Sequence, residues 1–170
     1  MTRFVLVEDD REVEKVAQLA REIWTEYYTP FIGQEQVEYM LSNFQSTEAI
    51  KKQIQKGILY YLLLYMEENA GYMALEPFRE DRQAKLSKIY VRSDLRGRGL
   101  GWKLLEQAVV VCQEISIETL WLTVNINNKV AIDFYERTGF IKAGKIIQNI
   151  GAGFVMDDYK MVKTINPGNM

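Results

Sequence analysis

The sequence predicts a mixed α/β fold in a single domain over residues 1–170. Its length and its hydrophobic content of 48% suit one well-buried core. The almost wholly apolar run over 58–66 is typical of a central strand that is buried on both faces. A strand, an amphipathic helix and a second strand follow one another over 84–124, which indicates a parallel crossover. Helices and strands therefore share one sheet-based core.

The amino-terminal part predicts a strand at 4–7 and a long first helix. Asp9 and Glu12 have the spacing of a capping box that opens this helix, and apolar residues then recur at helical intervals. We expect Pro30 and Gly33 to end it. The other predicted elements are helices at 37–44 and 46–56, strand 58–66, turn 67–71, strand 72–75, polar loop 77–83, strand 84–91, helix 102–115, strand 120–124, helix 128–137 and strands 140–147 and 153–162.

The composition excludes several classes of function. The chain has no histidine, so the commonest hydrolase and zinc-enzyme designs are unavailable. The net charge of −2 gives no basic surface for nucleic acid. No apolar run is long enough for a membrane span or a signal peptide, and we expect a cytoplasmic protein. Cys112 lies in the apolar pattern of a helix and is expected to pack there.

A glycine-rich loop at residues 96–101, with the sequence RGRGLG, lies between a predicted strand and a predicted helix. Its glycines remove the Cβ atoms that keep backbone amides away from a ligand, and the helix start adds a partial positive charge. An anion such as a diphosphate is expected there, with a simple change of chain direction as the alternative. The glycine spacing fits neither a dinucleotide fingerprint nor a Walker loop.

A second motif follows the strand at 120–124, where Asn128 opens a predicted helix and Tyr135 lies about two turns later. Together with the glycine-rich loop, this motif resembles the GNAT superfamily of acyl-CoA-dependent N-acetyltransferases. The resemblance covers about residues 58–162. It implies a mostly antiparallel mixed sheet of about seven strands, splayed between strands four and five and flanked by helices on both faces.

The resemblance also implies that the chain binds acetyl-CoA and needs no metal. The strand ending at Val91 would pair with pantetheine, amides over 96–102 would hold the diphosphate, and Tyr135 would protonate the leaving thiolate as the catalytic residue. From the residues alone, Asn128 can instead cap a helix and Tyr135 can be a core aromatic. The implied cofactor-binding residues are Ile89, Tyr90, Val91, Arg96, Gly97, Arg98, Gly99, Leu100, Gly101, Trp102, Asn128, Ala131 and Tyr135.

The chain departs from the family at Ser87, where many relatives carry a glutamate that accepts the amine proton. A serine without an activating partner is a poor base. The deprotonation route is therefore expected to use water, a backbone carbonyl, Tyr90 or a carboxylate such as that of Glu76.

The acceptor is expected to bind near the aromatic and acidic segment at 24–31, because carboxylates and aromatic faces bind cationic amines. Candidate acceptor-binding residues are Trp24, Tyr27, Tyr28 and Glu76, with a small primary amine such as a polyamine as substrate. Alternatively, Trp24 and Tyr27 belong to the core face of the first helix. A peptide or protein N-acetyltransferase and a non-catalytic acyl-CoA-binding module are the competing functions. The strand at 153–162 suggests a homodimer.

Overall fold

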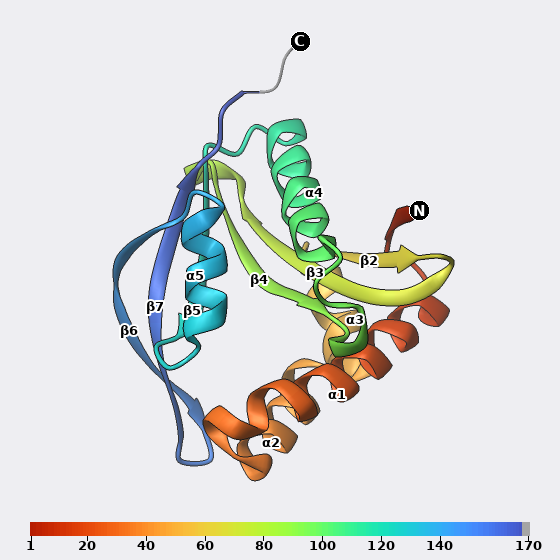
Figure 1. Cartoon of the computed structure of the whole chain (residues 1–170), viewed down its shortest axis with the longest axis vertical. Coiled ribbons are helices and arrows are strands. Elements are labelled where there is room, and N and C mark those ends of the chain that lie inside the picture. Colours follow the sequence, from red (N-terminus) through yellow and green to blue (C-terminus); the bar gives the residue numbers. More distant parts are fainter. Residues whose placement is uncertain (168–170) are drawn as a thin grey trace. The chain divides into compact units, whose positions relative to one another are not determined.

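The computed structural model describes residues 1–167. The helices are α1 (Asp10–Ile32), α2 (Gln34–Phe44), α3 (Thr47–Gln55), α4 (Leu100–Glu114) and α5 (Lys129–Arg137), with short 3-10 helices η1 (Arg79–Asp81) and η2 (Ser93–Leu95). The strands are β1 (Thr2–Leu6), β2 (Leu59–Tyr65), β3 (Glu68–Phe78), β4 (Gln83–Val91), β5 (Thr119–Asn125), β6 (Ile141–Gly151) and β7 (Phe154–Thr164). Figure 1 follows this order in colour along the chain.

The strands form a seven-stranded mixed sheet in the order β1-β2-β3-β4-β5-β7-β6. Strands β4 and β5 are parallel, and their register joins Gln83–Lys85 to Thr119–Trp121, at the amino ends of both strands. The pairs β1–β2, β2–β3, β5–β7 and β6–β7 are antiparallel. The mixed α/β sheet and its parallel crossover, both predicted from the sequence, are confirmed.

The chain divides into two compact units. The first unit contains Met1–Glu76 and Lys88–Glu106, and the second contains Pro77–Ser87 and the chain from Gln107 onward. Strands β3 and β4 and helix α4 each contribute residues to both. The expectation that residues 1–170 form one domain stays a prediction.

Helix α1 begins at the predicted capping box. The Asp9 side chain accepts a hydrogen bond from the Glu12 amide at 2.8 Å, and Glu12 Oε1 accepts from the Asp9 amide at 3.3 Å. The expected helix end at Pro30 is wrong, because α1 includes Pro30 and continues to Ile32. Gly33 does end it, with a φ of 85° that favours glycine.

The turn between β2 and β3 is shorter than the sequence predicts. Met66 and Glu67 both have positive φ, 52° and 65°, which makes a tight two-residue hairpin, and β3 begins at Glu68. The register between β2 and β3 shifts between Leu63 and Leu64, where the pairing skips Ala70. Strand β3 also extends to Phe78, so part of the expected polar loop belongs to the sheet.

A buried polar network stiffens the first unit. The Tyr72 hydroxyl donates to Gln45 Oε1 at 2.7 Å, and Gln45 Nε2 donates to the Tyr60 hydroxyl at 3.0 Å. Tyr60 in turn donates to Gln53 Oε1 at 2.6 Å, and Lys88 Nζ lies 2.6 Å from the Tyr60 oxygen. Burial raises the pKa of both tyrosine hydroxyls. Both therefore stay protonated at neutral pH and are satisfied by these partners.

The second unit is built on β5, β7 and β6. Its apolar side chains include Leu120, Leu122, Ile132, Phe140 and Met161, all buried. Strand β6 is last in the sheet order and largely exposed. No helix over residues 1–167 is long and apolar enough to cross a membrane.

Candidate active site

The glycine-rich loop (residues 96–101) connects η2 to α4 in the first unit. Gly97 and Gly99 have φ values of 79° and 76°, which L side chains rarely adopt. A Cβ built on either residue meets nothing within 4 Å. Their conformation, rather than lack of space, therefore requires glycine. The first amides of α4 follow directly, as an anion-binding site at a helix start needs.

Both arginines of the glycine-rich loop lie over tyrosine rings. The Arg96 guanidinium carbon is 4.7 Å from the centroid of Tyr27 on α1, and that of Arg98 is 5.8 Å from the centroid of Tyr65 on β2. Both arginines are exposed, so their charge remains available to an anion. The loop thus combines two cationic side chains that contact tyrosine rings with two glycines in the left-handed backbone conformation.

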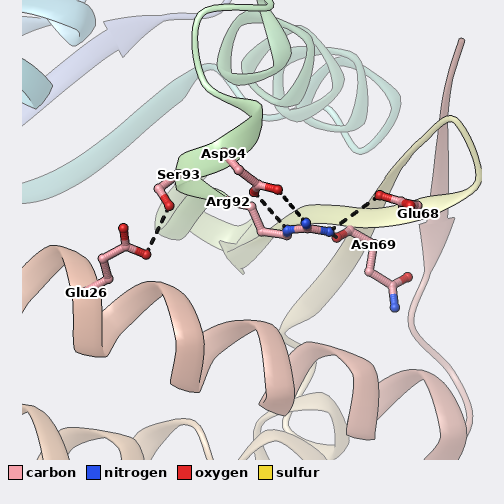
Figure 2. Close-up of polar contacts among 6 residues, drawn as sticks. All are labelled: Glu26, Glu68, Asn69, Arg92, Ser93 and Asp94. Atoms are coloured by element: carbon pink, nitrogen blue, oxygen red, sulfur yellow. Dashed lines mark hydrogen bonds and ion pairs between the residues drawn. The ribbon is translucent and has the colours of Figure 1, made fainter.

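Arg92 anchors the chain just before this loop (Figure 2). Its guanidinium donates to Asp94 at 2.6 and 3.1 Å and to the carbonyl of Asn69 at 3.1 Å, and it lies 3.8 Å from the Glu68 carboxylate. The neighbouring Ser93 hydroxyl donates to Glu26 on α1 at 3.0 Å. Side chains from β3 and α1 therefore hold the segment that leads into the loop.

The end of β4 approaches β3 closely at Gly71. A Cβ on Gly71 would lie 2.3 Å from the Tyr90 carbonyl oxygen and 3.2 Å from Val91 Cα. The Arg92 amide donates to the carbonyl of Ala70 at 2.8 Å, one residue further along. Ile89, Tyr90 and Val91 are half-buried. Glycine at position 71 is thus required for the path of the strand that is expected to pair with pantetheine.

Two of the aromatic residues expected to bind the acceptor, Trp24 and Tyr28, contact Tyr90 at this same strand end. Tyr28 and Tyr90 share a hydrogen bond of 2.8 Å between their hydroxyl oxygens. Trp24 is 3% exposed and packs edge-on against both rings. Its burial agrees with the alternative that it belongs to the core face of α1, whereas Tyr27 and Tyr28 are half-buried.

A charged cleft of about 620 Å³ lies beside α1 in the first unit. Arg21 pairs with Glu38 at 3.1 Å and Arg92 pairs with Asp94, so both arginines in its lining are balanced by carboxylates. Its complete lining is Arg21, Glu22, Ile23, Thr25, Glu26, Glu38, Arg92, Ser93 and Asp94. The carboxylates of Glu22 and Glu26 give the cleft a net negative charge.

The second motif, from Asn128 to Tyr135, lies in the second unit. Asn128 is buried and caps α5, since its Oδ1 accepts from the Ala131 amide at 3.2 Å. This confirms that Asn128 opens the helix. Tyr135 is half-buried, with ring contacts to Phe134 and Phe140 at centroid distances of 5.4 and 5.6 Å.

One group that sequence reasoning missed is Asp158 on β7. It is 3% exposed, and burial raises the pKa of its carboxyl to about 6. Ser87, at the position of the family glutamate, and Glu76, a candidate acceptor of the amine proton, are both half-buried. The sequence could not single out Asp158, because Asp157 and Asp158 are adjacent residues of the same type and only the structure shows that Asp157 is exposed and Asp158 buried.

The glycine-rich loop and the second motif both lie in a segment that matches a known family. Residues 17–140 match the model described as Acetyltransferase (GNAT) family. The [Ribosomal protein bS18]-alanine N-acetyltransferase of Salmonella typhimurium is 41% identical over 61 residues, which are 36% of this chain and 41% of that protein. The chain spans between a quarter and about half the length of several curated relatives that it matches.

Two further likenesses extend over most of the chain. The spermidine N(1)-acetyltransferase of Thermoplasma acidophilum is 23% identical over 151 residues, 86% of this chain and 90% of that protein. The crystal structure of the PaiA N-acetyltransferase from Thermoplasma acidophilum in complex with coenzyme A matches with a TM-score of 0.80. That match has 20% identity and covers 96% of this chain and 99% of the other, so it supports the fold.

Proposed function

Because the chain belongs to the GNAT acetyltransferase family, we propose that it transfers an acetyl group from acetyl-CoA to a primary amine. The amine attacks the thioester directly while both substrates are bound. The glycine-rich loop carries this proposal, since it joins two left-handed glycines, two exposed arginines and the start of α4. These groups fit an anionic diphosphate.

In this proposal the first unit binds most of the donor. Backbone amides over 96–102 hold the diphosphate, and the arginines add charge-assisted contacts. Backbone groups of Ile89, Tyr90 and Val91 pair with the pantetheine arm as an added strand would. The Val91 amide is the proposed donor to the thioester oxygen, on which negative charge develops during attack.

The second unit supplies Asn128, Ala131 and Tyr135 in the same proposal. The capping contact of Asn128 uses its Oδ1, and its amide nitrogen is the end that donates to pantetheine. Ala131 is a small residue beside the same arm. The Tyr135 hydroxyl is the proposed proton donor to the leaving thiolate, because a phenol placed beside the sulfur can protonate it as the C–S bond breaks.

The proposed acceptor is a small cationic amine, with a polyamine as the first candidate. Tyr27, Tyr28 and Glu76 are its proposed contacts, and the buried Trp24 packs against the ring of Tyr28. The negative cleft beside α1 adds support, and so does the spermidine acetyltransferase among the relatives. A polypeptide amino terminus is the second candidate, favoured by the likeness to the bS18-alanine N-acetyltransferase.

A homodimer and a cytoplasmic location complete the proposal. Strand β6 lies at the edge of the sheet with Ile141 and Ile147 exposed, and Val155 on β7 is exposed as well. An edge strand of this kind pairs readily with another strand. Light scattering on the purified protein tests the dimer, and a monomeric mass at micromolar concentration contradicts it.

The test of the function has a binding arm and a turnover arm. Acetyl-CoA binding is measured by calorimetry for the wild type, Arg96→Ala and Arg98→Ala, with the exposed Arg79→Ala as the control. We expect each loop variant to weaken binding about 10-fold, the effect of losing one charged hydrogen bond, and the control to match the wild type.

In the turnover arm, thiol release is followed with spermidine, spermine, amino acids and a peptide with an alanine amino terminus. Turnover of polyamines supports the first candidate, and turnover of the peptide alone replaces it with the second. Binding of acetyl-CoA without acetylation of any amine supports a non-catalytic module. Absence of acetyl-CoA binding contradicts the whole proposal.

A further inference from the structure

Asp158 is a buried carboxylate that the second unit does not fully satisfy. Its side chain is 3% exposed, and Oδ1 has no hydrogen-bond partner in the described part of the chain. A buried ionised oxygen without a donor is costly, and such groups are normally paired with a charge or a ligand. One oxygen of this buried carboxylate is therefore left without a hydrogen-bond donor from the described part of the chain.

The register of the sheet puts this carboxylate at the carboxyl end of β5. Asp158 lies opposite Asn125, the last residue of β5. Asn125 itself lies three residues before Asn128. The Thr123 side chain, two residues earlier on β5, donates a hydrogen bond to the carboxylate. Residues opposite each other in an antiparallel pair share a face, and so do alternate residues of one strand. Asp158, Asn125 and Thr123 thus form one polar group next to the second motif.

Burial and neighbouring groups shift the pKa of Asp158 in opposite directions. Burial raises its pKa to about 6, and Asp157 beside it on β7 acts in the same direction. Lys85 of β4 and the Thr123 hydrogen bond lower it. The positively charged Lys160 lies opposite Thr123, and the β6 residue opposite Asp158 is the apolar Ile146. Near neutral pH the carboxylate is ionised, yet it takes up a proton more readily than an exposed aspartate does.

We propose that Asp158 is the base that accepts the proton of the acceptor amine. The inference rests on the function proposed above and deepens it, because it assigns the proton acceptor that the sequence leaves open. The chain has no histidine, and Ser87 stands where many relatives carry a glutamate. In this proposal a carboxylate on β7 takes the role of proton acceptor that the glutamate has in those relatives, whereas the glutamate position, Ser87, lies on β4.

The reaction balances with this assignment. The bound ammonium gives one proton to the Asp158 carboxylate, and the freed nitrogen lone pair attacks the thioester carbon. The C–N bond forms, the C–S bond breaks, and its electron pair leaves on sulfur. The thiolate takes the Tyr135 proton, the phenolate regains one from the new amide nitrogen, and Asp158 releases its proton to solvent. The products are the N-acetyl amine, CoA and one proton.

The first test compares Asp158→Asn with Asp157→Asn, a matched change at the adjacent exposed carboxylate. We expect Asp158→Asn to lower kcat/KM for the amine about 10²- to 10⁴-fold, the usual contribution of a positioned base, and Asp157→Asn to stay within about twofold of the wild type. Acetyl-CoA affinity, measured by calorimetry, is expected to stay unchanged in both. Wild-type kcat/KM in Asp158→Asn overturns the inference, while an inactive wild type overturns the proposed function instead.

The pH profile separates a base from a merely structural carboxylate. The wild-type kcat/KM should fall as pH drops through about 6, the pKa of this carboxyl. In Asp158→Asn that limb should disappear, and the rate should rise with pH toward the pKa of the free amine. A limb near pH 6 that persists in Asp158→Asn overturns the assignment.

A second variant keeps the test decisive if Asp158→Asn does not fold. Thr123→Val removes the hydrogen bond to the carboxylate with little change in shape, so the acidic limb should move to higher pH. Lys85→Gln should move the limb in the same direction, because it removes a positive charge that favours the ionised form. If the limb stays at the wild-type pH in both variants, Asp158 is not the group that titrates.

Discussion

The guanidinium of Arg96, the first residue of the glycine-rich loop, lies 4.7 Å from the centroid of the Tyr27 ring on α1. The two neighbours of Tyr27 on α1 contact the same stretch of chain. Glu26 accepts a hydrogen bond from the Ser93 hydroxyl, and the Tyr28 hydroxyl shares a hydrogen bond with the Tyr90 hydroxyl. Three successive residues of α1 therefore contact the chain from the end of β4 to the loop. The helix expected to contact the acceptor thus also positions the residues expected to bind the donor.

Replacing Tyr27 with leucine should weaken acetyl-CoA binding about two- to fivefold, because an exposed cation–π contact contributes about 0.5–1 kcal/mol. The ring limits the rotamers of Arg96 before the ligand arrives, so its loss adds an ordering cost to binding. Tyr27→Phe keeps the ring and should bind acetyl-CoA like the wild type. Calorimetry decides the point, and equal affinity for the leucine and phenylalanine variants refutes this role of the ring.

Replacing Tyr135 with phenylalanine should lower kcat about 10²-fold, because it removes the proposed proton donor to the thiolate. The ring contacts with Phe134 and Phe140 remain, so the fold and the acetyl-CoA affinity should be unchanged. Rapid-quench measurement of acetyl transfer, together with calorimetry, checks both expectations. A wild-type kcat would exclude the Tyr135 hydroxyl as the acid.

Replacing Gly71 with alanine should destabilise the protein by about 1–3 kcal/mol, the usual cost of adding a methyl group to a site without room. The added Cβ would lie 2.3 Å from the backbone oxygen of Tyr90, which cannot rotate away as a side chain can. We also expect weaker acetyl-CoA binding, because β4 must shift. Urea unfolding of the variant measures the loss, and unchanged stability contradicts the close approach.

Asp158 should make stability depend on pH in a direction unusual for a carboxyl group. Its pKa is about 6 when folded and about 3.9 when unfolded, so the folded state binds the proton more tightly. The contribution to stability is present below about pH 4 and is lost as pH rises through about 6. Asp158→Asn carries no charge, so its stability relative to the wild type should increase by about 2–3 kcal/mol between pH 4 and pH 7. Urea unfolding across this range checks the trend, and a constant difference between the two proteins contradicts it.

Much of the fold follows from local sequence signals. The Asp9 capping box is visible as two residue types at a fixed offset, and its expected hydrogen bonds form. Asn128 opens its helix as predicted and caps it through its side-chain oxygen. The sequence predicts a turn at 67–71, but its contraction to Met66 and Glu67 could not be predicted, because neither residue type favours positive φ.

The candidate site is predictable to a smaller extent. The glycine-rich loop and Asn128 are recognisable from their spacing along the chain. The contact between Arg96 and Tyr27 joins residues far apart in the sequence, so only the packing of α1 reveals it. Asp158 emerges only from the register of β5 and β7, which decides that this aspartate is buried and its neighbour exposed.

The most direct test of the proposed function is product identification after the purified wild-type protein is incubated with acetyl-CoA and spermidine. We expect mass spectrometry to find N-acetylspermidine and free CoA in equal amounts, with neither formed beyond the background rate when the protein is omitted. Hydrolysis of acetyl-CoA without an acetylated amine, or no consumption of acetyl-CoA with spermidine and with every other amine and peptide of the panel, would contradict it.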